Sequence, residues 1–205
     1  MRRFMLFFTL TISLVAVLVM PTTANASSYY YGIGISTCAE LQAIDDDANS
    51  YSSAFYLENN IDCEGQQIDP LKWDTNFFAG TFDGNNFTIS NYSMDNGNQP
   101  VGLFQEIHGA TILDLKISDV DVTTSSIAGT LAGISKTSTI TNVHTEATTT
   151  STGFASGGLV GQSEDSTIDG SSSTGAVNAF FLGGGLVGYQ NSLAQYASVI
   201  KSSWS

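Results

Sequence analysis

The stretch "GFASGGLVGQSEDSTIDG" at residues 153–170 decides the fold. It places a glycine pair before Leu159-Val160, another glycine directly after them, and Ile168 nine residues beyond the leucine. The same phrase returns as "GGGLVG" at 183–188, and in weaker form as "GTLAG" at 129–133 and "GLF" at 102–104. A phrase that recurs at such intervals indicates a repeat architecture.

The repeat has a period of about 28 residues. The position numbers of the leucines in the four phrases differ by 28, 28 and 27: Leu103, Leu131, Leu159 and Leu186. An isoleucine follows the first three leucines after nine positions and the fourth after 14: Ile112, Ile140, Ile168 and Ile200. The last repeat therefore carries an insertion of five residues. An earlier segment, "FTISNYSM", places Ile89 in the same role, with Thr88 before it as a threonine precedes the next three isoleucines.

Such a unit is typical of one coil of a parallel β-helix, or β-solenoid. It has two short apolar runs, abundant Gly, Ser, Thr and Asn, and no helical periodicity. One coil cannot bury its own apolar side, so we expect stacked coils to form an interior ladder of leucine on leucine and isoleucine on isoleucine. The glycines fit places where neighbouring backbones approach closely. We therefore predict an all-β fold in which the threonines face outward.

The chain divides into three predicted parts. Residues 1–26 form a signal peptide, residues 27–95 an N-terminal cap with the first coil, and residues 96–205 the solenoid repeats. The cap is expected because the end of a solenoid exposes interior apolar surface. It should contain a short helix at "STCAELQAI", where Thr37 and Glu40 have the spacing of a capping box. After the helix, "AFYLENNIDC" alternates as a strand does, and "GTFDGNNFTI" contains an Asp-Gly turn.

The N-terminus predicts export. Arg2 and Arg3 precede a mostly apolar run over residues 4–20, and Ala24-Asn25-Ala26 is a small-residue cleavage site. An uncleaved membrane anchor is the alternative, because the run approaches the length of a spanning helix. In an oxidising compartment Cys38 and Cys63 are expected to form a structural disulfide, with two free thiols as the alternative. We expect a secreted or cell-surface protein.

Charge narrows the range of partners. Six basic and 19 acidic residues give a net charge of −13, and loss of Arg2 and Arg3 with the leader would make it −15. A negative surface repels nucleic acid and anionic lipid at long range. We therefore expect no nucleic-acid partner and no membrane insertion after signal cleavage, and we consider an extracellular glycan or a surface protein as the partner.

The repeats resemble a known family. The segments "GGLVGQSEDSTIDGSSSTGAV" at 157–177 and "GGLVGYQN" at 184–191 are similar to the GLUG repeat of bacterial exported and surface proteins, which include adhesin-like proteins and non-catalytic parts of some surface peptidases. The lead-in, with "GTFDGNNFTI" and "VGLFQEIHGATILDLKI", is similar to the segment that commonly precedes such repeats. The resemblance covers about residues 34–205 and weakens at "GTLAG" and at the inserted last coil. It implies a β-solenoid on a cell surface or in the medium, with no catalytic residues to carry over.

A search for chemistry nominates few residues. Parallel β-helices also carry polysaccharide lyases and hydrolases, whose sites need clustered carboxylates. Asp119 and Asp121 share a strand face and could reach one ligand, although a solvated turn or strand edge is the favoured interpretation. His108 and His144 have no partner at metal-ligand spacing. We therefore expect no enzyme, no cofactor and no metal.

Three weaker hypotheses concern binding. The acidic loop 45–50 starts as a calcium-binding EF-hand loop does but lacks its glycine and its final glutamate. An ice-binding threonine face would need regular threonines on both sides of each isoleucine, which the sequence lacks. Trp73 is the best aromatic candidate for stacking on a sugar, but the favoured alternative is that its ring packs the cap against the first coil.

The leading functional hypothesis is an exported, non-catalytic adhesion or interaction module of the cell surface. The alternatives are a polysaccharide-active lyase or hydrolase that uses the groove of the solenoid, and a passive surface spacer of a larger protein.

Overall fold

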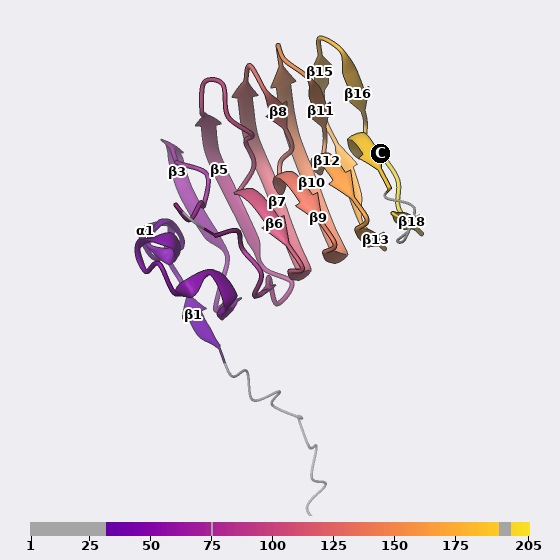
Figure 1. The fold of residues 1–205 in the computed structure, drawn as a ribbon. Helices are drawn as coiled ribbons and strands as arrows, with labels where there is room; N and C mark the ends of the chain where they lie inside the picture. The colour runs from indigo at the N-terminus through magenta and orange to yellow at the C-terminus, as the bar shows by residue number, and fades with distance from the viewer. Residues whose placement is uncertain (1–31, 75, 193–197) are drawn as a thin grey trace, which may run out of the picture.

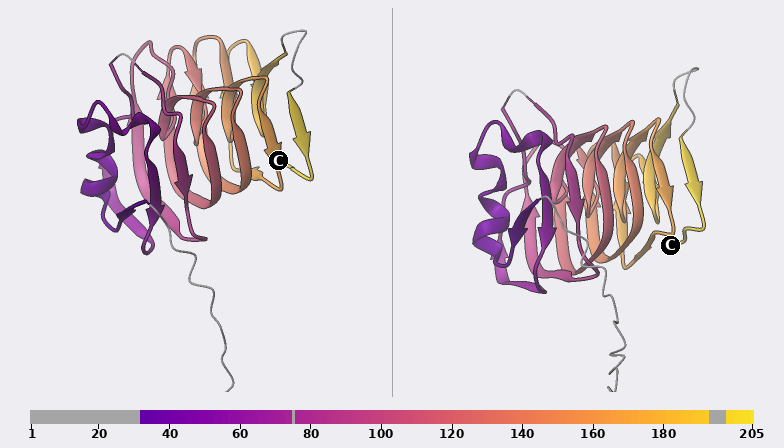
Figure 2. Two further views of the ribbon diagram at one scale, coloured as in Figure 1. Left: turned by 60° about the horizontal axis from the view of Figure 1, so that its bottom comes forward. Right: turned by 90° about the horizontal axis from the view of Figure 1, so that it is seen from below.

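The computed structural model describes residues 32–74, 76–192 and 198–205, and every strand pairing within them is parallel. Figures 1 and 2 show the chain wound into stacked coils, with a small helical region at one end. The predicted all-β parallel β-solenoid is confirmed. The predicted signal peptide lies outside the described residues. Within those residues, none of the helices combines the length and the apolarity needed to cross a bilayer.

The strands form three sheets around the solenoid axis. Sheet A, the largest, contains β1 (Ile33–Ile35), β2 (Ala54–Leu57), β3 (Ile61–Gln67), β4 (Thr81–Asp83), β5 (Thr88–Asp95), β7 (Thr111–Thr124), β10 (Thr139–Ser151), β13 (Thr167–Asp169), β14 (Ser172–Thr174), β15 (Val177–Ala179) and β18 (Val199–Lys201). Sheet B contains β6 (Phe104–His108), β9 (Ala132–Lys136), β12 (Val160–Glu164) and β17 (Val187–Asn191). Sheet C contains β8 (Ile127–Ala128), β11 (Ala155–Gly157) and β16 (Leu182–Gly184).

The strand register reproduces the sequence period. Ile112 pairs with Ile140, Ile140 with Ile168, and Ile168 with Ile200. Leu103, Leu131 and Leu159 are fully buried, and Leu186 is nearly so. Ile200 is 41% exposed, because β18 pairs with β13 on one side and with no described strand on the other. The interior columns are therefore continuous up to the last described coil.

The earliest coil differs from its predicted register. Phe82, not Ile89, pairs with Ile112, and Thr81, not Thr88, pairs with Thr111. Ile89 pairs instead with Ile117 and is fully buried in the neighbouring column. The coil from β4 to β7 is slightly longer than the one from β7 to β10. A turn over residues 84–87 separates β4 from β5, and both strands pair with β7.

The N-terminal region contains the predicted short helix and capping box. Helix α1 (Cys38–Gln42) begins at Thr37, whose hydroxyl accepts from the backbone N–H of Glu40 at 3.1 Å, while the Glu40 carboxylate accepts from the backbone N–H of Thr37 at 3.1 Å. The predicted disulfide joins Cys38 to Cys63 and so fixes α1 to β3. Two short 3-10 helices follow, η1 (Ile44–Asp46) and η2 (Ser50–Ser52). The segment "AFYLENNIDC" gives two strands, β2 and β3, and not one.

Glycines allow the coils to pack closely. A Cβ atom added at Gly157 would lie 2.0 Å from the carbonyl oxygen of Val160 and 2.5 Å from the backbone nitrogen of Gly188 in the next coil. No side chain fits at that distance. The repeated glycine segment therefore lies where the chain passes from sheet C to sheet B. At this point its backbone contacts the next coil.

The interior changes along the axis. Around β2, β4 and β6 it is aromatic: the Phe104 ring lies 4.9 Å from Phe78 and 5.5 Å from Phe82, measured between centroids. Around β10, β11 and β14 it contains buried serines and threonines, whose hydroxyls bond to each other and to the backbone. Thr145 Oγ1 donates to the Gly158 carbonyl oxygen at 3.0 Å, and Ser156 Oγ to Thr149 Oγ1 at 3.1 Å.

Candidate binding face

The outer face of sheet A is the widest surface of the solenoid, because β5, β7 and β10 are eight, 14 and 13 residues long. In-register pairing arranges the outward side chains of this face in rows that cross the strands. One row, which we call the tryptophan row, consists of Thr88, Lys116, His144, Ser172 and Trp204. The adjacent row consists of Ser90, Ser118, Glu146 and Thr174.

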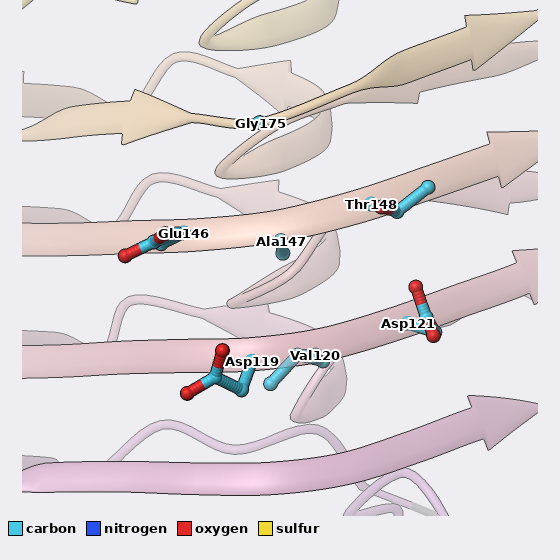
Figure 3. A pocket seen from close by; sticks show the side chains of 7 residues that line it. All are labelled: Asp119, Val120, Asp121, Glu146, Ala147, Thr148 and Gly175. Carbon is cyan, nitrogen blue, oxygen red and sulfur yellow. The ribbon is translucent and has the colours of Figure 1, made fainter.

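A depression of about 430 Å³ lies on this face and contains both predicted aspartates. Its lining, shown in Figure 3, is Asp119, Val120, Asp121, Glu146, Ala147, Thr148 and Gly175. The depression exists because β7 has one more residue here than β10: Asp119 has a left-handed backbone conformation (φ 55°), and the register shifts between Glu146 and Ala147. Such a bulge bends a strand and redirects its side chains.

The bulge separates the two aspartates. Figure 3 shows Asp119 and Glu146 at one side of the depression, and Asp121 with Thr148 at the other. Among the described residues, no group of three or more His, Cys, Asp or Glu side chains is arranged to hold a metal ion. The two aspartates line one depression, as their spacing suggested, but their carboxylates do not converge.

A second depression, of about 210 Å³, adjoins the first along the same face. It is lined by Thr88, Lys116, Ile117, Ser118, His144, Thr145, Glu146, Ser172 and Thr174. Glu146 belongs to both depressions. His144 is held by contacts from both ring nitrogens, Nδ1 with Ser172 Oγ at 2.8 Å and Nε2 with Asn142 Oδ1 at 2.9 Å. The Trp204 ring centroid lies 6.2 Å from that of His144.

The other histidine belongs to a charged cluster on sheet B. His108 Nε2 contacts Glu106 Oε2 at 3.2 Å, its ring stacks on Phe77 with centroids 3.7 Å apart, and its neighbours in register are Lys136 and then Glu164. Lys136 and Glu164 form an ion pair at 3.8 Å. Burial lowers the pKa of the His108 imidazole, and the bond with Glu106 only partly offsets this. The sequence showed His108 without a partner, and the fold supplies several.

The structure corrects the expectation for Trp73. Its side chain is 8% exposed, its ring stacks on Phe78 with centroids 5.6 Å apart, and its Nε1–H donates to Ser50 Oγ at 3.0 Å. The face expected to hold a sugar is therefore covered. Trp73 packs the cap against the first coil, which was the alternative interpretation.

The acidic loop beside Trp73 is tied to its neighbours. The carboxylate of Asp45 accepts from the backbone N–H of Lys72 at 2.9 Å, and burial raises the pKa of the Asp45 carboxyl despite this bond. Asp47 Oδ1 accepts from the backbone N–H of Asn49 at 2.9 Å. These bonds describe a structured turn after α1, in agreement with the simpler interpretation of residues 45–50.

Sequence reasoning missed Lys116, Glu146 and Trp204 as members of one surface. The repeat period could have placed Lys116 and Glu146 on this surface. Lys116 and His144 are separated by one repeat period, as are Ser118 and Glu146, so the period alone aligns them. The interval from Ser172 to Trp204 is longer than one period, because the last coil carries the insertion.

Comparison with known proteins gives a family match. Residues 38–147 match the family model described as the M26 IgA1-specific metallo-endopeptidase N-terminal region. The expectation that the chain is not an enzyme is wrong as it stands, because the matched family is defined by a metallo-endopeptidase and this chain corresponds to its N-terminal region.

Two individual proteins are also similar. Halomucin from Haloquadratum walsbyi is 33% identical over 144 residues, which is 63% of this chain and 2% of the length of halomucin. A crystal structure from Bacteroides ovatus, described as that of a candidate immunoglobulin A1 protease, superposes with a TM-score of 0.48 and 18% identity, over 83% of this chain and 64% of the other. The family match and the similarity to halomucin suggest a surface-associated protein.

Proposed function

We propose, from the premise that this chain belongs to the family of the M26 IgA1-specific metallo-endopeptidase N-terminal region, that it is an extracellular interaction module that binds glycan-bearing partners. The observation that carries this proposal is the outer face of sheet A, where in-register strands present rows of polar side chains beside two adjoining depressions. Long, regular faces of this kind suit extended ligands. The resemblance to GLUG repeats supports a role at the cell surface.

The proposed organisation follows the sequence. A leader over residues 1–26 would direct export, residues 27–95 would cap the solenoid, and residues 96–205 would present the binding face. In the structure, the disulfide between Cys38 and Cys63 lies within the proposed cap, as suits an oxidising compartment.

A second candidate function is favoured by the family match. In this case the same face would hold IgA1, which is named in the description of the family, for a peptidase domain. This candidate differs from the first in the partner and not in the surface. One experiment can therefore separate the two.

The experiment is electrophoresis of the purified full chain through gels with embedded polysaccharides, mucins or IgA1, after which each polymer is sized. Retardation by a polysaccharide or mucin that keeps its length supports the proposed function. Retardation by IgA1 alone supports the second candidate. Shortened polymer would contradict a binding role, and unaltered mobility in every gel would overturn both candidates in favour of a passive spacer.

A further inference from the structure

We propose that the tryptophan row is a subsite for a neutral glycan that lies across the strands of sheet A, with the exposed ring of Trp204 stacked on one sugar. The proposal rests on the proposed function, since it specifies the ligand class and the residues of the same face. It assigns the sugar-stacking role to Trp204 and not to Trp73.

The row has the dimensions of an oligosaccharide site. Its five side chains stand on consecutive paired segments from Thr88 to Trp204. Because neighbouring strands lie about 4.8 Å apart, the row extends over roughly 19 Å. It is therefore long enough for a short chain of sugars, and its members are regularly spaced.

Trp204 projects onto the outer face. Its backbone pairs with Ser172, its carbonyl oxygen accepts from Ser173 N–H at 3.1 Å, and its N–H donates to Ser171 O at 3.2 Å. Its ring inclines toward His144, whose side chain points outward from β10, and the indole is 59% exposed. The interior columns run along the other side of these strands. The ring therefore offers an apolar surface to a ligand on the outer face.

The polar groups beside the ring match the chemistry of sugar hydroxyls. Hydrogen bonds with Ser172 and Asn142 fix the orientation of the His144 imidazole, which lines one side of the proposed site. Lys116 takes part in none of the ion pairs found among the described residues, and it lines the second depression with Glu146. The ammonium group donates hydrogen bonds and the carboxylate accepts them, while a sugar hydroxyl does both.

The charge of the face favours a neutral glycan over an acidic one. The two depressions hold three carboxylates, Asp119, Asp121 and Glu146, against one lysine. The whole chain has a net charge of −13. A sialylated or uronic-acid chain would be repelled at long range, whereas a neutral one would not.

The test compares one mucin before and after removal of its sialic acid, with affinity measured for the full chain and its variants. We expect the unmodified chain to bind the desialylated mucin more tightly. Trp204→Ala should weaken this binding about tenfold, as loss of a stacked ring does, while Trp204→Phe should stay within about threefold. Lys116→Ala, at an exposed position within the row, should weaken it several-fold.

Phe180→Ala is the matched control, because Phe180 is an aromatic residue of the same end of the solenoid, is 71% exposed and lies outside the row. It should bind like the unmodified chain. Thermal unfolding of each variant shows whether the fold is intact, and Lys116→Ala decides the matter if Trp204→Ala is unstable.

The outcomes separate this proposal from its premise. If the unmodified chain binds mucin but Trp204→Ala and Lys116→Ala bind equally well, the subsite is wrong and the proposed function stands. Tighter binding of the sialylated mucin would overturn the neutral ligand alone. If the unmodified chain binds neither mucin, the glycan function fails together with the subsite.

Discussion

The two ends of the solenoid share one strand register but have different interiors. In the N-terminal region, built on β2 to β6, fully buried phenylalanines fill the space between the sheets, and a disulfide holds the cap. In the C-terminal region, built on β11 to β18, the interior contains small hydroxyl side chains, and Phe180, Phe181 and Trp204 are largely exposed.

This difference shows that the pairing of strands does not depend on one kind of interior side-chain packing in this fold. Close backbone contact at glycines supports the parallel register in both regions, and β18 pairs in register with β13 although the last coil is longer. Apolar burial is concentrated at the N-terminal end, while the candidate subsite lies toward the C-terminal end. We expect the first region to supply most of the stability and the second to tolerate changes at its surface.

The strongest test of this comparison is Phe104→Ala. Phe104 is fully buried against Phe78 and Phe82, so its truncation should lower the free energy of unfolding by about 4 kcal/mol, measured by urea denaturation. Phe180→Ala, which removes an equal ring from the exposed end, should cost less than about 0.5 kcal/mol. Equal losses for the two variants would refute the proposed concentration of stability.

Removal of the disulfide should act on the N-terminal region only. The bond closes a loop with a sequence separation of 25 residues, and the double variant Cys38→Ser, Cys63→Ser should lose about 3 kcal/mol. Hydrogen exchange should show lost protection in β1 to β3 and unchanged protection in β12 and β17. Uniform loss along the chain would mean that the solenoid unfolds as one unit and not from its cap.

Two glycines provide a matched pair for the packing part of the comparison. A Cβ atom at Gly157 or at Gly184 would lie 2.0 Å from the carbonyl oxygen of the valine three residues later, but at Gly157 it would also meet the next coil. Gly157→Ala should therefore cost about 1–3 kcal/mol, and Gly184→Ala less. Thermal unfolding of the two variants checks the order, and the reverse order would show that the last coil is the more tightly constrained one.

The smallest expected effect is a pH dependence centred on His108. Its pKa is lowered in the folded state by burial, while Glu106, Lys136 and Glu164 face it from sheet B. The unfolded chain binds the proton more readily, so stability is constant above the ordinary histidine pKa and falls as the pH drops through the folded value. His108→Gln should reduce the decrease in melting temperature between pH 8 and pH 5.5. An unchanged decrease would assign it to other groups.

Much of the fold could be predicted because the repeat is local and regular. The repeat period and the capping box at Thr37 follow from spacing, and the disulfide follows from two cysteines in a chain predicted to be exported. The structure contains all three. Ile89 was assigned to the column of Ile112, which is occupied by Phe82, because the turn over residues 84–87 lengthens that coil. The period of the later coils does not reveal this turn.

The site was harder to predict, since it depends on contacts between coils. Trp73 was the best aromatic candidate for a sugar contact, yet its burial is decided by contacts with Phe78 and Ser50, which its own segment does not reveal. A bulge of one residue separates Asp119 from Asp121. The simple alternation of side chains along a strand, on which the prediction was based, does not reveal such a bulge. The position of Trp204 depends on how the last coil absorbs its insertion.

The in-register stacking of β7 on β10 also has a consequence for how such a gene can change. Because Ile112 and Ile140, like Lys116 and His144, are separated by one coil, a crossover that duplicates or deletes the codons of one whole coil within this part would rejoin strands at equivalent positions. Each added coil would lengthen the outer face by about 4.8 Å without requiring a new fold. The reach of the module can thus evolve independently of its cap.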